Sequence, residues 1–437
     1  MKKRFIAYIL ILLCLLSFVA CNTSKDINYA AGKGRYTEEE TFPAQTEKVT
    51  EKKETEPQRE TENDITETEA ETEPEVIEDI RLSFLCCGDN IGHESVYNDA
   101  QRRATEDSYE YNFLPMYDGV RSLFASADIK FINQETVTAD ASFGYHGYPN
   151  FNTPQDMGRT IVDLGFDIVN IATNHMLDMR AAGYQSELDF WKTQDILMIG
   201  GYENEEDYNT IRYFETNGIK IALLSYTYGT NGIILDYGSS LVVPYIDSDT
   251  ITRQVTAAKE SADLVFVSMH WGTDSSLEIT SEQKQYAQLL TNLGVDVVIG
   301  HHSHTLQDME WKENSEGHKT LIIYSLGNLL HSMYYDASET RNYCFLVGGV
   351  ATFDIVISQT DGIYIDNPLY HPTVCHYTKD PTGQLHAGNF CVYELKDYTE
   401  ELCSEHSSQR EHRFTLANLY DYVKAQVSPE FLTEDYK

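Results

Sequence analysis

The chain has 437 residues, of which 41% are hydrophobic, so it is long enough for one large folded domain or two modest ones. Its 69 acidic and 32 basic residues give a formal net charge of −37 at pH 7. Nucleic acid is therefore not expected as a partner, because phosphate backbones require a basic surface. An acidic polymer would also be repelled unless metal ions or local cations offset the charge.

Residues 1–21 have the pattern of a lipoprotein signal peptide. The basic opening MKKRF precedes the apolar run IAYILILLCLLSFVA, which is shorter than the about 20 residues that span a bilayer. The run ends in FVAC, which resembles the bacterial lipobox with Cys21 as the lipidated residue, although Phe18 stands where leucine is usual. A plain signal peptide and an uncleaved anchor are the alternatives. We expect an exported protein, lipid-anchored to the outer face of the bacterial cytoplasmic membrane.

Residues 22–79 are predicted to form a disordered linker. Between Glu38 and Asp79 the chain carries 17 acidic and four basic residues with few apolar groups, which cannot offset the entropy cost of ordering. We expect a solvated tether between the membrane and the folded domain; a partner-binding tail is the alternative.

From Ile80 onward, apolar strand-like runs alternate with helical patterns, which predicts an α/β fold. In SEQKQYAQLLTNLG, apolar residues at i, i+3, i+4 and i+7 from Tyr286 form one helical face, and the strand VDVVIG follows. Thr153 and Pro154 predict the N-cap and first residue of an earlier helix, which leads into the strand FDIVNIA. Alternation alone predicts a single open sheet.

The folded domain is predicted to cover residues 80–388, and residues 389–437 to form a C-terminal extension, either an appended subdomain or a surface helix. No Cys-x-x-Cys pair occurs, so a thiolate zinc site is not indicated. Cys86 and Cys87 are neighbours on an apparent strand, and we expect both to be small buried residues.

Six strand-like runs end in polar side chains of the kinds that bind metal ions. These side chains, with their immediate followers, are Asp89, Asn90, His93, Asn133, Glu135, Asn174, His175, His270, His301, His302, His304 and Asn328. Because ligands of open α/β sheets bind beyond the carboxyl ends of the strands, we expect these groups at one rim. Carboxylate, amide and imidazole without thiolate suit Mn, Zn or Fe, and a set larger than four indicates two ions.

Each strand end has an ordinary explanation when it is taken alone. A Gly-Asp pair after a strand is often a turn, and a lone histidine such as His270 is more often packed than a ligand. His302 and His304 are stronger candidates, because alternate residues of an extended chain place two imidazoles on one side. The recurrence at six strand ends favours one shared metal site.

The ordered motifs GDNIGH, INQET, ATNH, MHWG, GHHSHTLQ and YSLGN resemble those of the CapA poly-γ-glutamate capsule-synthesis family, over about residues 82–331. That family is similar to the calcineurin-like metallophosphoesterases. The resemblance implies a four-layer α-β-β-α sandwich in place of the single sheet, with a centre of two divalent metal ions.

The resemblance also implies roles for single residues. The implied metal ligands are Asp89, Glu135, Asn174, His270, His302 and His304. The implied catalytic residue is His175, with His93 as a candidate for the histidine that metallophosphoesterases carry at the position of Ile91. The implied substrate-binding neighbours are Asn90, Asn133, His301 and Asn328. Glu135 stands where those enzymes place a bridging aspartate.

Two functions are consistent with this resemblance. The first is a membrane-tethered, metal-dependent hydrolase or transferase of capsule or envelope biosynthesis, acting on an anionic polymer such as poly-γ-glutamate or on a phosphoester. The second is a non-catalytic surface protein that binds or guides such a polymer. In both cases other envelope-biosynthesis proteins are expected partners.

Overall fold

The computed structural model describes residues 79–333, 342–383, 387–410 and 413–437. The predicted signal peptide with Cys21, and residues 22–78 of the predicted linker, lie outside the described residues. Within the described ranges, none of the helices combines the length and the apolar character that a bilayer crossing requires.

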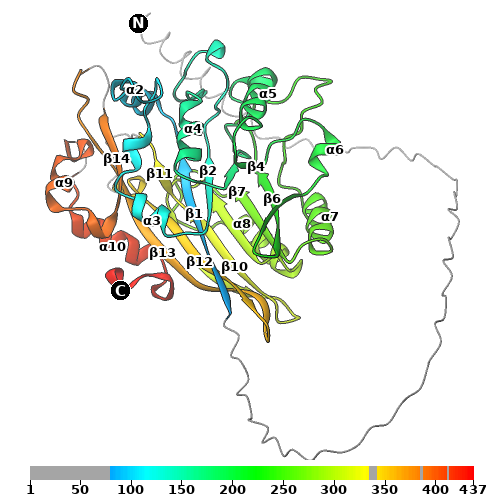
Figure 1. The fold of residues 1–437 in the computed structure, drawn as a ribbon. Coiled ribbons are helices and arrows are strands. Elements are labelled where there is room, and N and C mark those ends of the chain that lie inside the picture. The colour runs from blue at the N-terminus through cyan, green and yellow to red at the C-terminus, as the bar shows by residue number, and fades with distance from the viewer. Residues whose placement is uncertain (1–78, 334–341, 384–386, 411–412) are drawn as a thin grey trace, which may run out of the picture. The chain divides into compact units, whose positions relative to one another are not determined.

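Two β-sheets form the centre of the fold (Figure 1). The described strands of the first sheet lie in the order β14 (Gly388–Glu394), β13 (Gly362–Thr378), β12 (Val347–Ser358), β1 (Ile80–Asn90), β2 (Ile129–Gln134), β3 (Ile168–Asn170) and β4 (Leu197–Ile199), with β11 (Asn328–Leu330) parallel to β1. Those of the second lie in the order β5 (Arg212–Thr216), β6 (Ile219–Thr227), β7 (Leu264–His270), β8 (Val297–His301), β10 (Lys319–Leu326) and β9 (Leu306–Glu313).

The two-sheet α/β architecture confirms the fold implied by the motifs, and the single open sheet expected from alternation is wrong. Strands β1 to β4 pair in parallel, as do β6, β7, β8 and β10, while β12, β13 and β14 add antiparallel pairs to the first sheet. Alternation predicts that each strand has a parallel neighbour. It does not indicate which of two sheets a strand joins, because that depends on pairing between distant segments.

Helices lie between the strands and after them. The described α-helices are α2 (Glu94–Arg102), α3 (Arg121–Ala125), α4 (Asp156–Asp163), α5 (Arg180–Trp191), α6 (Glu205–Tyr208), α7 (Ser248–Lys259), α8 (Ser281–Asn292), α9 (Glu400–Glu405) and α10 (Leu416–Gln426). The predicted helix in SEQKQYAQLLTNLG is confirmed as α8. Thr280 and Gln283 form a capping box at its N-terminus.

The main hydrophobic core lies between the two sheets. Phe84 on β1 packs edge-on against Phe266 on β7 with ring centroids 5.2 Å apart, and it stacks on Phe353 of β12 at 4.9 Å. Cys86 and Cys87 are both buried in β1, as expected. The three phenylalanines come from both sheets, so their packing fixes the position of one sheet relative to the other.

A second apolar cluster covers the outer face of the second sheet. Ala222, Val265 and Val298 of the sheet pack with Val255 of α7 and Leu290 of α8, and all five are buried. The buried apolar residues of α3, α4 and α5 instead belong to the main core. Helices therefore flank both sheets, as Figure 1 shows for α4, α5 and α7.

The predicted N-cap at Thr153 is wrong. Helix α4 begins at Asp156, and its N-cap Gln155 makes no side-chain cap hydrogen bond. Thr153 is fully buried, and its hydroxyl contacts the carbonyl oxygen of Gly92 at 3.2 Å and the hydroxyl of Thr136 at 2.9 Å. The tertiary contacts of the hydroxyl thus replace the local capping bond that the sequence pattern suggests.

The segment after residue 388 packs against both sheets. Strand β14 pairs antiparallel with β13 at the edge of the first sheet. On α10, the hydroxyl of Tyr422 accepts a hydrogen bond from the backbone N–H of Leu306 on β9 at 3.0 Å. All described residues belong to one compact unit.

Glu187 is a buried acid on α5 whose ionisation opposes folding. Its side chain accepts hydrogen bonds from the backbone N–H and the hydroxyl of Thr138, at 2.9 and 3.0 Å. Burial raises the pKa of Glu187 to about 7, although these hydrogen bonds act to lower it.

Glu187→Gln is expected to flatten the pH dependence of the free energy of unfolding. The folded-state pKa of Glu187 lies above its unfolded value of 4.5. The contribution of protonated Glu187 to the free energy of unfolding is therefore fully present below pH 4.5, and it is lost as the pH rises to about 7. The loss amounts to about 3 kcal/mol. Denaturant unfolding between pH 4.5 and 7.5 measures it, with the exposed Glu206→Gln as control. Equal pH slopes in wild type and Glu187→Gln would contradict the assignment.

Candidate metal centre

Strand register brings the candidate residues into rows. In the first sheet Asp89 on β1 pairs with Asn328 on β11 and with Asn133 on β2, which in turn pairs with Asn170 on β3. In the second sheet His270 on β7 pairs with His301 on β8. Parallel strands that end at one level therefore present these polar side chains together, as the rule for open α/β sheets requires.

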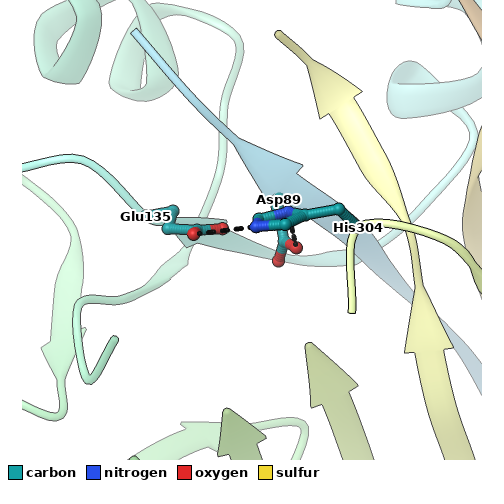
Figure 2. A group of neighbouring side chains, drawn as sticks. All are labelled: Asp89, Glu135 and His304. Carbon is teal, nitrogen blue, oxygen red and sulfur yellow. Dashed lines mark ion pairs between the residues drawn. The ribbon is translucent and has the colours of Figure 1, made fainter. Parts of the chain in front are cut away.

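Asp89, Glu135 and His304 form the centre of the site (Figure 2). His304 Nδ1 lies 3.1 Å from Asp89 Oδ2, and His304 Nε2 lies 3.5 Å from Glu135 Oε1. One ligand atom of each residue lies within 4.8 Å of the others, and all three residues are buried. Figure 2 shows the imidazole of His304 between the two carboxylates. This spacing allows the three groups to hold one divalent cation.

The charges of this cluster depend on one another. Burial raises the pKa of Glu135, whereas contacts with His301 and His304 overcome burial and lower the pKa of Asp89. Burial acts to lower the pKa of His304, but the charges of Glu135 and Asp89 raise it to about 10. A proton on His304 thus balances the carboxylates in the absence of metal, and a divalent ion would balance them better.

His270, Asn174 and His302 form a second group beside the first. His270 Nε2 lies 2.9 Å from Asn174 Oδ1, and the rings of His270 and His302 have centroids 4.8 Å apart. Burial lowers the pKa of His270, and it lowers that of His302 to about 3. Both imidazoles are therefore neutral at pH 7, which is the form that binds metal.

Several buried ligand atoms of both groups have no hydrogen-bond partner within the described ranges. They are Glu135 Oε2, His270 Nδ1 and His302 Nδ1. A buried polar atom without a partner is costly, and coordination to a metal ion would offset that cost. The residues present therefore fit divalent metal. The sequence prediction of two ions stays a prediction.

The loop after β8 holds two of the histidines in an uncommon backbone conformation. His302 has φ 95° and His304 has φ 57°, both in the left-handed region that disfavours side chains. The backbone N–H of His302 donates to Asp89 Oδ2 at 3.3 Å. Such local strain persists where the surrounding contacts hold it, and it is common at ligand-binding sites.

His175 lies beside the metal groups and is held by a carboxylate. Its Nδ1 lies 2.7 Å from Asp178 Oδ2, and its ring packs edge-on against Phe151 at 4.8 Å. Asn231 Nδ2 approaches the same Nδ1 at 3.4 Å and Asn174 Nδ2 donates to Asn231 Oδ1 at 3.2 Å. The shorter contact with Asp178 decides the orientation of the ring.

Two candidates have contacts away from the Asp89–Glu135–His304 cluster. The amide of Asn90 donates to Gln134 Oε1 at 2.8 Å and accepts from the hydroxyl of Tyr117 at 2.7 Å. His93 is the N-cap residue of α2, its Nδ1 accepts from the backbone N–H of Ser332 at 3.1 Å, and its ring packs edge-on against Phe151. Their roles with substrate and in catalysis stay predictions.

The other three substrate-binding candidates contact the candidate metal ligands themselves. Asn133 Nδ2 donates to Asp89 Oδ1 at 2.8 Å, and Asn328 Oδ1 lies 3.0 Å from His304 Nδ1. His301 Nδ1 lies 3.4 Å from Asp89 Oδ1. These contacts orient the ligands, as the outer partners of metal sites do. Substrate binding by the three residues stays a prediction.

Sequence reasoning missed three residues of the site. Asn170 accepts from Ser225 and donates to Asn133 Oδ1 at 2.7 Å; an asparagine inside the apolar run FDIVNIA was a usable signal. Asn231 and the half-exposed Tyr228, whose ring lies 4.4 Å from that of His302, follow β6. Asn231 carries an amide like the candidate ligand Asn174, so its residue type was a usable signal, whereas Tyr228 offered none.

Asp89→Asn is expected to remove metal from the site. The variant keeps the shape of the side chain but loses the charge that His302, His304 and Asn133 surround, so affinity for Mn²⁺ or Zn²⁺ should fall at least about tenfold. Metal content after dialysis and titration calorimetry measure the change. The exposed Asp189→Asn serves as the matched control. Equal metal retention in the two variants would contradict the ligand assignment.

Comparison with known proteins gives matches over the same region. Residues 83–333 match the family model described as bacterial capsule synthesis protein PGA_cap. A capsule biosynthesis protein CapA of Bacillus anthracis is 28% identical over 222 residues, which cover 47% of this chain and 51% of that protein. A PGA biosynthesis protein CapA of Bacillus subtilis is 29% identical over 194 residues, covering 44% and 48%. The chain spans about half the length of these curated relatives.

Solved structures with similar folds are distant in sequence. A putative 5′-nucleotidase of Staphylococcus aureus aligns with a TM-score of 0.43 and 15% identity, covering 70% of this chain and 57% of that one. A calcineurin-like phosphoesterase of Bacillus subtilis, YfkN, aligns with a TM-score of 0.39 and 11% identity, covering 78% and 99%.

Proposed function

The chain belongs to the bacterial capsule synthesis protein family PGA_cap, and from this premise we propose that it is an exported, metal-dependent hydrolase or transferase of an anionic envelope polymer. One observation carries the proposal. The buried cluster of Asp89, Glu135 and His304 has the donor types and charge of a metal site, with His175 close by. Relatives named for capsule and PGA biosynthesis support an envelope polymer as the substrate class.

The residues of the site have two proposed roles, holding the metal and orienting the residues that hold it. Asp89, Glu135 and His304, with His270, His302 and Asn174 beside them, would hold the metal. When bound, a divalent ion supplies a Lewis acid that polarises the reacting bond and lowers the pKa of water. Asn133 and Asn328 keep Asp89 and His304 in place through their hydrogen bonds. The low exposure of all these groups strengthens their electrostatic effect on a reacting centre.

His175 is the proposed proton-transfer group. Its Nδ1 faces Asp178 at 2.7 Å, which holds a proton on Nδ1 and leaves Nε2 to exchange a proton with the substrate. In hydrolysis, Nε2 of the protonated ring would give its proton to the leaving oxygen or nitrogen as the bond to phosphorus or carbon breaks. Asp178 holds the ring in place during that step.

Activity of the metal-loaded full chain tests this proposal. We expect turnover of phosphodiesters or γ-glutamyl polymers after loading with Mn²⁺ or Zn²⁺. His175→Ala should lower kcat by about 10²- to 10⁴-fold with metal content unchanged. Asp178→Asn should lower kcat and alter the pH profile, because the ring loses the group that sets its tautomer. His318→Ala, near Asp296 at the end of β8 away from the site, is the control.

Absence of turnover with both substrate classes, in protein that retains metal, would contradict the enzymatic proposal. The alternative function, a surface protein that binds or guides the polymer, would then remain.

Anchoring at the membrane is part of the proposal. The apolar run that ends in FVAC and the acidic linker that follows it support a lipid at Cys21 and a tethered domain. Cys21→Ser is expected to move the protein from the membrane fraction to the soluble fraction of cells, as immunoblotting would show. An unchanged distribution would contradict lipid anchoring. Contacts with other envelope-biosynthesis proteins are proposed on the same basis.

A further inference from the structure

Tyr228 is a half-exposed side chain next to the buried group of His270, Asn174 and His302. It follows the end of β6 and is 44% exposed, whereas these three candidate ligands are 0%, 6% and 2% exposed. The proposed mechanism gives Tyr228 no role. A molecule that approaches the second group from solvent can therefore touch Tyr228 directly.

The position of Tyr228 is set by the two histidines of this group. Its ring lies 4.4 Å from that of His302, and it is nearly parallel to the ring of His270 at 6.4 Å. Its backbone N–H donates to the carbonyl oxygen of His270 at 3.0 Å. Because both the ring and the backbone contact candidate ligands, the side chain belongs to the site.

The hydroxyl of Tyr228 faces the amide of Asn174. Burial raises the pKa of this hydroxyl, and a side-chain hydrogen bond from Asn174 acts to lower it. Asn174 Oδ1 lies 2.9 Å from His270 Nε2, so the amide presents its nitrogen to the tyrosine, and Tyr228 Oη is the acceptor. A hydroxyl that accepts such a bond still has its own proton to donate to another group.

The same amide links Tyr228 to the proposed proton-transfer group. Asn174 Nδ2 also donates to Asn231 Oδ1 at 3.2 Å, and Asn231 Nδ2 lies 3.4 Å from His175 Nδ1. The nitrogen side of Asn174 therefore has Tyr228 and Asn231 beside it, with His175 next in the chain of contacts. An O–H donor thus lies between the candidate metal ligands and the group that is proposed to move a proton.

We propose that Tyr228 is a further catalytic residue, whose hydroxyl donates a hydrogen bond to an oxygen on the reacting phosphorus or carbon of the substrate. Negative charge increases on that oxygen as water or another nucleophile adds. A hydrogen bond to a charged acceptor is stronger than one to a neutral acceptor, so Tyr228 stabilises the transition state more than the bound substrate. No proton is transferred. This inference rests on the proposed function and adds a substrate-contacting residue to it.

A purely structural role is the alternative explanation of these contacts. In that case the ring of Tyr228 supports His302 by packing, and the hydroxyl contributes nothing to ligand binding. Tyr228→Phe separates the two roles, because it keeps the ring and removes only the hydroxyl.

Binding of inorganic phosphate to the metal-loaded full chain tests the hydroxyl without requiring turnover. Phosphate presents the charged oxygens that the proposed hydrogen bond would recognise. In titration calorimetry, Tyr228→Phe should weaken phosphate binding by about tenfold or more with metal content unchanged, because a hydrogen bond to a charged group is lost. Tyr237→Phe is the matched control. It removes a hydroxyl from a fully exposed ring in the same loop between β6 and α7, and it should leave binding unchanged.

The outcomes distinguish this inference from the proposed function. Weaker phosphate binding by Tyr228→Phe without turnover of any substrate would support the hydrogen bond and count against the hydrolase or transferase. Equal phosphate affinity in wild type and Tyr228→Phe would overturn the inference, and turnover by both would leave the enzymatic proposal standing. Failure of metal-loaded wild type to bind phosphate, or loss of metal from Tyr228→Phe, would also overturn it.

Discussion

The carboxylate of Asp89 is fully buried at the end of β1, and the site depends on how its charge is stabilised. An ionised group in the interior is tolerated only when paired and hydrogen-bonded. Asn133 on β2 donates to one oxygen, while His302 and His304 of the loop after β8 approach the other. These partners come from both sheets, so this charge is stable only when the sheets pack in the observed register.

A chain of hydrogen bonds extends this constraint across the core. Ser225 on β6 donates to Asn170 Oδ1 on β3, Asn170 donates to Asn133 Oδ1, and Asn133 donates to Asp89. The orientation of each asparagine amide is fixed by its two neighbours in this chain. Its oxygen must accept from the preceding residue, and its nitrogen must donate to the following one. The network therefore aims the Asp89 oxygens before any ligand arrives, which is the preorganisation that metal binding and catalysis require.

The loop that carries His302 and His304 is held by close backbone packing as well as by polar contacts. A side chain at Gly300 would place its Cβ 2.1 Å from the carbonyl oxygen of Tyr324, so only glycine permits this approach of β8 to β10. The histidines that follow adopt left-handed conformations, and Asn328 contacts His304 through both its oxygen and its nitrogen. Rigid surroundings thus compensate local strain, and the imidazoles face the carboxylates.

The sequence by itself determined the α/β class, the family motifs and the types of side chain at the candidate site, because strand periodicity and the residues after each strand are local properties. Only the tertiary structure decided which strand joins which of the two sheets, and that Glu135 and His304 meet at Asp89 while Asn90 contacts Tyr117. Adjacent residues of a strand face opposite sides, but the strand pattern by itself does not decide whether Asp89 or Asn90 faces His304. Contacts between segments far apart in the chain made that distinction.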